Sequence, residues 1–158
     1  MKLIDWLSPS AVMADLKATS RDQTLAELVA ALPPEPGLSA SEVEAVLRER
    51  EDQSSTAVQE GVAIPHGRLP GLKRMVMSFG RSRAGIPFGA PDHQPTRLFF
   101  LLLVPSNSTG GHLKALARIA RLSRDRALRE QLLAAPDAAS LFQTLAAADQ
   151  ELAGKGAP

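Results

Sequence analysis

Hydrophobic positions recur at helical spacing in two segments of the first third of the chain. Apolar residues at positions 25, 28, 29 and 32 share one face of a predicted helix over residues 20–32, with Ser20 as its N-cap. Residues 39–51 repeat the pattern, and Ser39 with Glu42 forms a candidate capping box. The stretch "LPPEPG" between them contains three prolines, so we expect two separate helices joined by a short connection.

Strand-like segments follow at residues 55–58, 62–64, 75–79 and 98–104. The last of these, "LFFLLLV", has no polar position on either face. An apolar run of this kind is typical of a strand that is covered on both sides. We therefore expect it at the centre of a sheet.

Three more amphipathic segments close the chain, at residues 110–125, 126–135 and 137–149, and Asp137 is a candidate N-cap of the last one. The order is helices, strands, helices, and a central mixed sheet with helices on both faces buries all the apolar faces most simply. We expect a single α/β domain over residues 1–158, with 1–15 as an N-terminal arm anchored by Trp6 and 152–158 as a flexible tail.

Charge and composition narrow the possible functions. Lys and Arg number 18 against 17 Asp and Glu, so we do not expect a nucleic-acid partner. The absence of cysteine excludes a disulfide scaffold, a thiolate metal site and a cysteine nucleophile. The apolar run that ends at Pro105 is far shorter than a membrane span, and "MKLIDWLSPSAVMADLKA" does not read as a secretion signal. We expect a cytoplasmic protein without membrane insertion.

The stretch "GVAIPHGRL" places a histidine between a proline and a glycine at the end of a predicted strand. In the simplest interpretation His66 belongs to a tight corner, because Pro65 fixes its own φ and Gly67 relaxes the next position. In the functional interpretation, the same corner holds the imidazole at a sheet end with its direction fixed and little covering it. That arrangement suits a nucleophile or a ligand.

Metal binding and serine hydrolysis are two possible chemistries for these histidines. His66, His93 and His112 are the only imidazoles, and no two of them lie three or four residues apart, as metal-binding pairs on a helix do. Ser82, in "FGRSRAG", partly matches a nucleophile elbow, but Ala84 replaces its second glycine, and a polar surface turn explains the segment as well. His93 lies in "GAPDHQP", where we expect an exposed loop.

Phosphoryl transfer to the imidazole is the third possibility. A neutral ring nitrogen is a good nucleophile near pH 7, and an incoming phosphoryl group needs hydrogen-bond donors more than a base. The candidate donors are Arg68, backbone N–H groups beside Gly67, and the upstream residues Arg50, Ser54, Ser55 and Thr56. The segment "PSNSTGGH" leads into a helix that starts close to His112, and a helix N-terminus favours an anion. It is not a Walker loop, because the Gly-Lys-Ser/Thr ending is missing.

Two blocks, "RERE…SST…GVAIPHGRL" and "LLLVPSNSTGGHLKALARIARL", together resemble the type-2 enzyme IIA domain of the bacterial phosphotransferase system. This is the fructose/mannitol class, and the nitrogen-regulatory branch is the most similar. The resemblance extends over about residues 16–147. It implies a three-layer α/β/α sandwich with a central mixed sheet, which agrees with the fold expected from the hydrophobic pattern.

The resemblance also implies roles for particular residues. His66 matches the histidine that accepts a phosphoryl group on Nε2 from an HPr-like phosphocarrier, and His112 matches a second histidine that stabilises that group. Arg50 and Arg68 match positions beside the site. No metal or organic cofactor is implied, because the donor is itself activated. The partner downstream is either a set of regulatory target proteins or a sugar-specific IIB domain.

Departures from the family pattern occur just before the acceptor. The family often has "STGIGNGIAIPHG", where this chain has "SSTAVQEGVAIPHG", so that Ala57, Gln59 and Glu60 are substitutions. We expect the Glu60 side chain to point outward; pointing inward, it would weaken phosphate binding. Five arginines at helical spacing are expected to form a solvated face: Arg118, Arg121, Arg124, Arg126 and Arg129.

Overall fold

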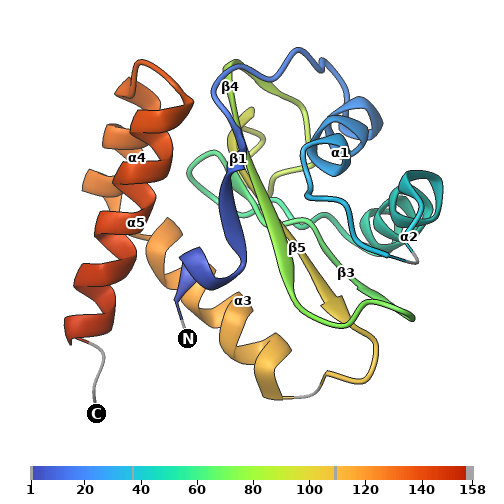
Figure 1. The fold of residues 1–158 in the computed structure, drawn as a ribbon. Coiled ribbons are helices and arrows are strands. Elements are labelled where there is room, and N and C mark those ends of the chain that lie inside the picture. The colour runs from blue at the N-terminus through green and yellow to red at the C-terminus, as the bar shows by residue number, and fades with distance from the viewer. Residues whose placement is uncertain (1, 37, 109, 156–158) are drawn as a thin grey trace.

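A five-stranded mixed sheet lies between two layers of helices in the computed structural model, which describes residues 2–36, 38–108 and 110–155. Helices α1 and α2 cover one face of the sheet, and α3, α4 and α5 cover the other (Figure 1). The predicted three-layer α/β/α sandwich is therefore confirmed. The elements follow one another as η1 (Leu3–Asp5), β1 (Leu7–Met13), α1 (Arg21–Ala30), α2 (Ala40–Gln53), β2 (Val62–Ala63), β3 (His66–Leu69), β4 (Val76–Ile86), β5 (Thr96–Pro105), α3 (Gly110–Ser123), α4 (Arg126–Ala134) and α5 (Ala138–Lys155).

Strand β5 lies inside the sheet, as its apolar sequence predicted. The order is β1-β4-β5-β2, with β4 and β5 antiparallel and the other pairs parallel. The short strands β2 and β3 follow one another along the same edge of β5, where Val62 pairs with Leu98 and His66 with Leu102. His66 is thereby fixed by a parallel ladder to the most deeply buried strand.

The alternation of side chains along β5 explains why neither of its faces is polar. Phe99, Leu101 and Leu103 pack in the cluster under α1 and α2. Phe100 and Leu102 pack in the cluster under α3, α4 and α5. Successive residues of a strand point to opposite faces, and both faces are covered by helices here.

The predicted helix starts are confirmed by their caps. The Ser20 hydroxyl accepts from Gln23 N, and the Ser39 hydroxyl accepts from Glu42 N. The Asp137 carboxylate accepts from Ser140 N. Each contact satisfies one of the backbone donors that a helix N-terminus leaves free.

The N-terminal segment differs from its sequence-based description. Residues 7–13 form β1, which pairs in parallel with β4, and Trp6 is buried beside it. The sequence "LSPSAVM" gives a weak strand signal because Pro9 cannot donate a ladder hydrogen bond, and the edge position of β1 tolerates this. Residues 55–58 make only an isolated bridge, at Ala57, and α5 continues to Lys155.

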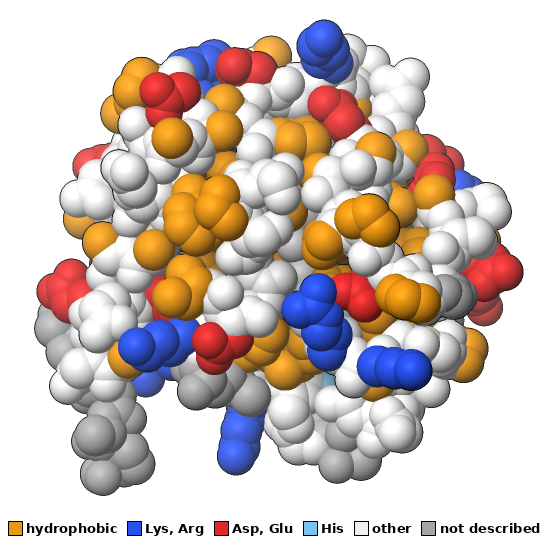
Figure 2. Space-filling model, viewed as in Figure 1, with side chains coloured by type: hydrophobic (Ala, Val, Ile, Leu, Met, Phe, Trp, Pro, Cys, Tyr) orange, Lys and Arg blue, Asp and Glu red, His pale blue; other side chains and the backbone are white. Residues whose placement is uncertain are grey.

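Within the described ranges, no helix is both long and apolar enough to span a membrane. On the face seen in Figure 2, basic and acidic side chains are interspersed around apolar patches. No single sign of charge dominates that face.

Candidate functional site

His66 is the first residue of β3, and its ring is fixed from the backbone side. The ring Nδ1 lies 2.7 Å from the carbonyl oxygen of Ile64. A carbonyl can only accept, so Nδ1 carries the proton and donates it to this bond. In the neutral ring, Nε2 is therefore the nitrogen with a free lone pair. The residue is half-buried, which leaves that nitrogen within reach of a ligand.

An open cavity of about 330 Å³ surrounds this ring. It brings together four of the residues singled out in the sequence: His66, Arg68, Arg50 and His112. They come from β3, from the C-terminal end of α2 and from the start of α3. The start of α3, which is more than 40 residues from β3 in the chain, thus meets β3 and the end of α2 at one site.

His112 stands in the first turn of α3, with its ring centroid 5.8 Å from that of His66 and the ring planes tilted by 54°. Its side chain is almost completely buried, and within the described residues its Nδ1 has no hydrogen-bond partner. A buried polar atom without a partner is uncommon and is often completed by a ligand or water. The neighbouring N-terminus of α3 also favours an anion at this place.

Both imidazoles are shifted toward the neutral form. Burial lowers the pKa of His66, the bond to the Ile64 carbonyl works in the opposite direction, and the positive charge of Arg50 lowers the pKa further. Burial also lowers the pKa of His112, with smaller contributions from the charges of Arg68 and His66. The His66 ring is therefore poised as an uncharged nucleophile.

The two arginines are held by backbone carbonyls. Arg50 donates from Nη1 to the carbonyl of Ser54 at 2.8 Å, just past the end of α2. Arg68 donates from Nη1 to the carbonyl of Ser108 at 2.7 Å, in the segment before α3. Each guanidinium has further N–H groups that are not used in these bonds. Both can therefore offer donors to an anion in the cavity.

Gly67 has a different purpose from the one expected. A Cβ at this position would lie 3.0 Å from Cγ1 of Val46 on α2. Its φ is not in the left-handed region, so the corner does not require glycine for its turn. Glycine instead allows α2 to pack closely on β3, which brings Arg50 to His66.

The cavity also contains residues that the sequence analysis did not single out. Val46, Glu49 and Gln53 line it together with Arg50. The spacing of 46, 49, 50 and 53 is that of one helix face, so the helical pattern around Arg50 was a usable signal. Glu49 is acidic, whereas the other charged residues that line the cavity, Arg50 and Arg68, are basic.

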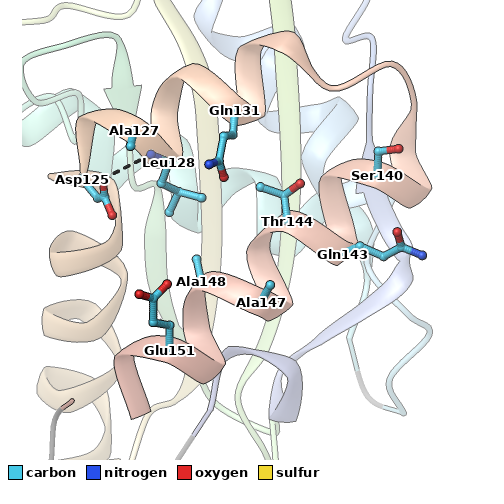
Figure 3. Close-up of a pocket in the computed structure, with 10 residues that line it drawn as sticks. All are labelled: Asp125, Ala127, Leu128, Gln131, Ser140, Gln143, Thr144, Ala147, Ala148 and Glu151. Atoms are coloured by element: carbon cyan, nitrogen blue, oxygen red, sulfur yellow. Dashed lines mark hydrogen bonds between the residues drawn. The ribbon is translucent and has the colours of Figure 1, made fainter. Parts of the chain in front are cut away.

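Other candidate chemistries find no support in the geometry. No group of three potential metal ligands occurs among the described residues. Ser82 is buried in β4 and accepts a hydrogen bond from Gly85 N, while His93 lies in an exposed loop. A larger cavity of about 630 Å³ lies between α4 and α5 and is lined by neither His66 nor His112 (Figure 3).

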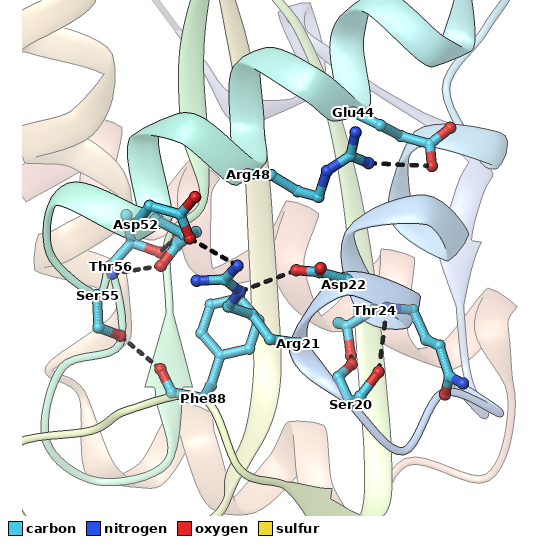
Figure 4. Close-up of polar contacts among 12 residues, drawn as sticks. Ser20, Arg21, Asp22, Thr24, Glu44, Arg48, Asp52, Ser55, Thr56 and Phe88 are labelled. Atoms are coloured by element: carbon cyan, nitrogen blue, oxygen red, sulfur yellow. Dashed lines mark hydrogen bonds and ion pairs between the residues drawn. The ribbon is translucent and has the colours of Figure 1, made fainter.

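Ser55 and Thr56 do not line the histidine cavity. The Ser55 hydroxyl donates to the carbonyl of Phe88, and the Thr56 hydroxyl and N–H both donate to the buried Glu51 carboxylate (Figure 4). These bonds fix the segment after α2. From the sequence, both residues were candidates for binding phosphate. In the structure their hydroxyl groups instead form these internal hydrogen bonds.

The structure also shows the contacts of Glu60 and of two of the five arginines between positions 118 and 129. The Glu60 carboxylate is exposed and lies 3.9 Å from Nη2 of Arg129, away from the cavity around His66. The arginines do not form a uniform solvated face, because Arg118 pairs at 2.6 Å with the buried Asp149. Arg129 donates to the carbonyl of Ser123.

Comparison with protein families matches residues 5–148 to the description "Phosphoenolpyruvate-dependent sugar phosphotransferase system, EIIA 2". The "Nitrogen regulatory protein" of Bradyrhizobium diazoefficiens is 43% identical over 146 residues, covering 92% of this chain and 95% of that protein. The "PTS system fructose-specific EIIABC component" of Bacillus subtilis is 31% identical over 85% of this chain, which spans only 21% of that relative.

Among solved structures, the Nitrogen Regulatory Protein IIA-Ntr from Neisseria meningitidis superposes with a TM-score of 0.84. It is 36% identical, and the match covers 89% of this chain and 97% of that one. The sandwich and its connections are thus shared over nearly the whole chain.

Proposed function

Because this chain belongs to the type-2 EIIA family of the phosphoenolpyruvate-dependent sugar phosphotransferase system, we propose that it accepts a phosphoryl group on Nε2 of His66. The donor is a phosphohistidine carrier of the HPr type. One observation carries the choice of atom: the bond from Nδ1 to the Ile64 carbonyl leaves Nε2 as the free nucleophile beside Arg50, Arg68 and His112.

The transfer exchanges one P–N bond for another. The lone pair on Nε2 of His66 attacks phosphorus while the bond to the donor's ring nitrogen breaks, and the donor keeps that electron pair. No general base is needed, because burial keeps the His66 ring neutral. The proton on Nδ1 stays in its bond to the Ile64 carbonyl and steadies the ring as it becomes positively charged.

The surrounding groups offset the charge that arrives. A phosphoryl group brings close to two negative charges at neutral pH. The unused N–H groups of Arg50 and Arg68 are cationic donors that line the same cavity, and the His112 ring lies there at the start of α3. Charge-assisted hydrogen bonds of this kind are each worth about 1.5–3 kcal/mol where water is partly excluded.

We assign the output to regulation of other proteins by the phosphorylation state of His66. The support is the similarity to nitrogen regulatory proteins, which cover nearly the full length of this chain. The exchange then takes place in the cytoplasm. A transport role, with transfer to a IIB domain, is the second candidate, supported by the similarity to a fructose-specific component.

The acceptor is tested by incubating the protein with labelled phosphoenolpyruvate, enzyme I and an HPr-like carrier. We expect an acid-labile, base-stable label on His66. His66→Ala should take up none, and His112→Ala should take it up more slowly on His66. The exposed His93 offers a matched control, His93→Ala, which should behave as wild type. Label at the wild-type level in His66→Ala would refute the proposal.

The two outputs are separated by adding a IIB domain to the labelled protein. Rapid passage of the label to a fructose- or mannitol-type IIB domain would favour transport. A label that stays on the chain and changes its binding to other proteins would favour regulation.

A further inference from the structure

A second groove, of about 530 Å³, lies at the opposite end of α3 from the histidines. Its walls are the loop of residues 57–60, the last turn of α3 and Arg129 of α4. His112 and Ser123 are 11 residues apart on α3, which corresponds to about 17 Å along the helix axis. The groove is therefore distinct from the site proposed above, and it contains the residues at which this chain departs from the family pattern.

Two guanidinium groups line the groove. Arg129 is largely buried and fixed, since its Nη1 donates to the carbonyl of Ser123 at 2.8 Å. Arg124 is exposed, and its side chain has no hydrogen bond or ion pair with any part of the chain that the structure describes. One cation is thus held in place while the other is available to a ligand.

A carboxylate stands at the rim of the same groove. Glu60 has φ of 68°, in the left-handed region that residues with a Cβ seldom adopt. Its N–H donates to the side chain of Asp92 at 3.1 Å, which pins this conformation. The Glu60 carboxylate is 68% exposed and meets Arg129 only at 3.9 Å, so most of its hydrogen-bonding capacity is unused. Unusual backbone geometry held by a specific bond often marks a functional position.

Apolar groups line the groove beside these charges. The Val58 side chain is 42% exposed, and Ile64 and Ala120 line the groove with it. A groove of this kind has an apolar surface to pack a short hydrocarbon and a few polar groups to orient it.

We propose that this groove binds a free α-amino acid with an aliphatic side chain. Its carboxylate pairs with the guanidinium of Arg124, its ammonium with Glu60, and its side chain lies on Val58 and Ile64. The groove has two guanidiniums and one carboxylate, so neither a simple anion nor a simple cation pairs with all of its charges. A zwitterion satisfies both signs at once, and an arginine fork suits a carboxylate.

The test uses the full unphosphorylated chain and L-leucine as the probe, followed by ¹H–¹⁵N correlation spectra. We expect saturable shifts at residues 58–60 and 120–129. Two leucine analogues separate the charges: 4-methylpentanoate lacks the ammonium, and 3-methylbutylamine lacks the carboxylate. Each should bind at least about tenfold more weakly, which corresponds to the loss of one charge-assisted bond.

Three variants complete the experiment. Arg124→Ala and Glu60→Gln change exposed side chains and should each weaken leucine binding about tenfold, while the spectra verify that the fold is intact. Arg126→Ala removes an exposed arginine that does not line the groove, and its binding should match wild type. Absence of saturable shifts with leucine, or binding of either analogue as tight as that of leucine, overturns the proposal. Because no phosphoryl group is involved, this result stands apart from the assignment of His66.

Discussion

Single atoms decide the chemistry of the histidine cavity. The Ile64 carbonyl selects the ring nitrogen of His66 that stays free, and burial keeps that nitrogen unprotonated. Arg68, which the sequence analysis identified as a candidate phosphate ligand, donates one N–H to the Ser108 carbonyl. Arg68 therefore adds a positive charge to the cavity and also holds the segment that leads to His112.

The first prediction concerns the pH dependence of the two imidazoles. Titration followed by NMR should place the midpoints of His66 and His112 below the ordinary value of about 6.5, because burial disfavours the charged ring. Arg50→Ala should raise the midpoint of His66, and Arg68→Ala that of His112, because each change removes a neighbouring positive charge. A midpoint at or above the ordinary value for His66 would contradict this account.

The same shifts have a consequence for stability. The unfolded chain takes up protons on both rings as the pH falls through about 6.5, while the folded chain resists protonation. The unfolded state is thereby favoured, so the free energy of unfolding should decrease as the pH falls from about 6.5 toward the folded-state midpoints. Denaturant unfolding across this window checks the sign, and His66→Gln should reduce the slope.

A second prediction concerns Arg68. Arg68→Ala should slow phosphorylation of His66 by about tenfold to a hundredfold, because a charge-assisted contact in the transition state is lost. Arg68→Lys should recover only part of the rate, since lysine keeps the charge but cannot bridge a carbonyl and a phosphoryl group in one plane. Arg74→Ala is the matched control, because Arg74 is exposed and pairs with Glu35. Wild-type rates in Arg68→Ala would remove this residue from the site.

Elements on the α3–α5 face of the sheet are joined by a buried carboxylate. Asp149 of α5, only 1% exposed, accepts from Nε of Arg118 on α3 and from the N–H of Leu3. One side chain thus connects α5, α3 and the start of the chain. Arg81 is also buried, and it donates to the carbonyls of Leu132 and Ala135 at the end of α4.

The third prediction follows from this junction. Asp149→Ala should lower the free energy of unfolding by about 3 kcal/mol, because it leaves the largely buried Arg118 guanidinium and the Leu3 N–H without their carboxylate acceptor. For a domain of this size that corresponds to a decrease in Tm of roughly 6–12 °C. Glu130→Ala provides the comparison, since it breaks only the exposed i,i+4 pair with Arg126 and should cost under about 0.5 kcal/mol. Equal decreases in Tm for the two variants, measured by calorimetry, would show that the bonds of Asp149 do not stabilise the protein more than an exposed ion pair does.

For the whole molecule, the first strand and the last helix pack against each other across two layers of the sandwich. Strand β1 extends the sheet beside β4 and also contacts α5, and Leu3, Leu7 and Ala11 belong to the core shared with α3, α4 and α5. The N-terminal arm inferred from the sequence is therefore part of the fold. Its absence would expose the edge of β4 and an apolar face.

The fourth prediction is that a protein lacking residues 1–13 does not fold cooperatively. The deletion removes a strand, the burial of several large apolar side chains and the bond from Leu3 to Asp149. Circular dichroism should show a broad thermal transition, and size-exclusion chromatography should show aggregation. Ser10→Ala, at an exposed position of β1, should unfold like wild type. A sharp transition in the truncated protein would show that residues 1–13 are not needed for cooperative folding.

The amino-acid sequence was sufficient to predict the features that depend on local pattern. Helical periodicity and the caps Ser20, Ser39 and Asp137 located the helices, and "LFFLLLV" identified the central strand, because side-chain alternation and capping act over a few residues. The Pro-His-Gly corner drew attention to His66, and the helix start after "PSNSTGGH" drew attention to His112, whose role the resemblance supplied.

Features that require distant segments to meet became visible only in the folded chain. Only the packing of α2 on Gly67 and of α3 beside β3 brings Arg50 and His112 to His66. Only the folded chain shows that Ser55 and Thr56 turn away and that Asp149 is buried. Pro9 weakens the local strand signal of β1, and the strand that pairs with β1 lies more than 60 residues away in the chain. Such contacts depend on the pairing of non-local elements, and a one-dimensional pattern carries no record of which elements become neighbours.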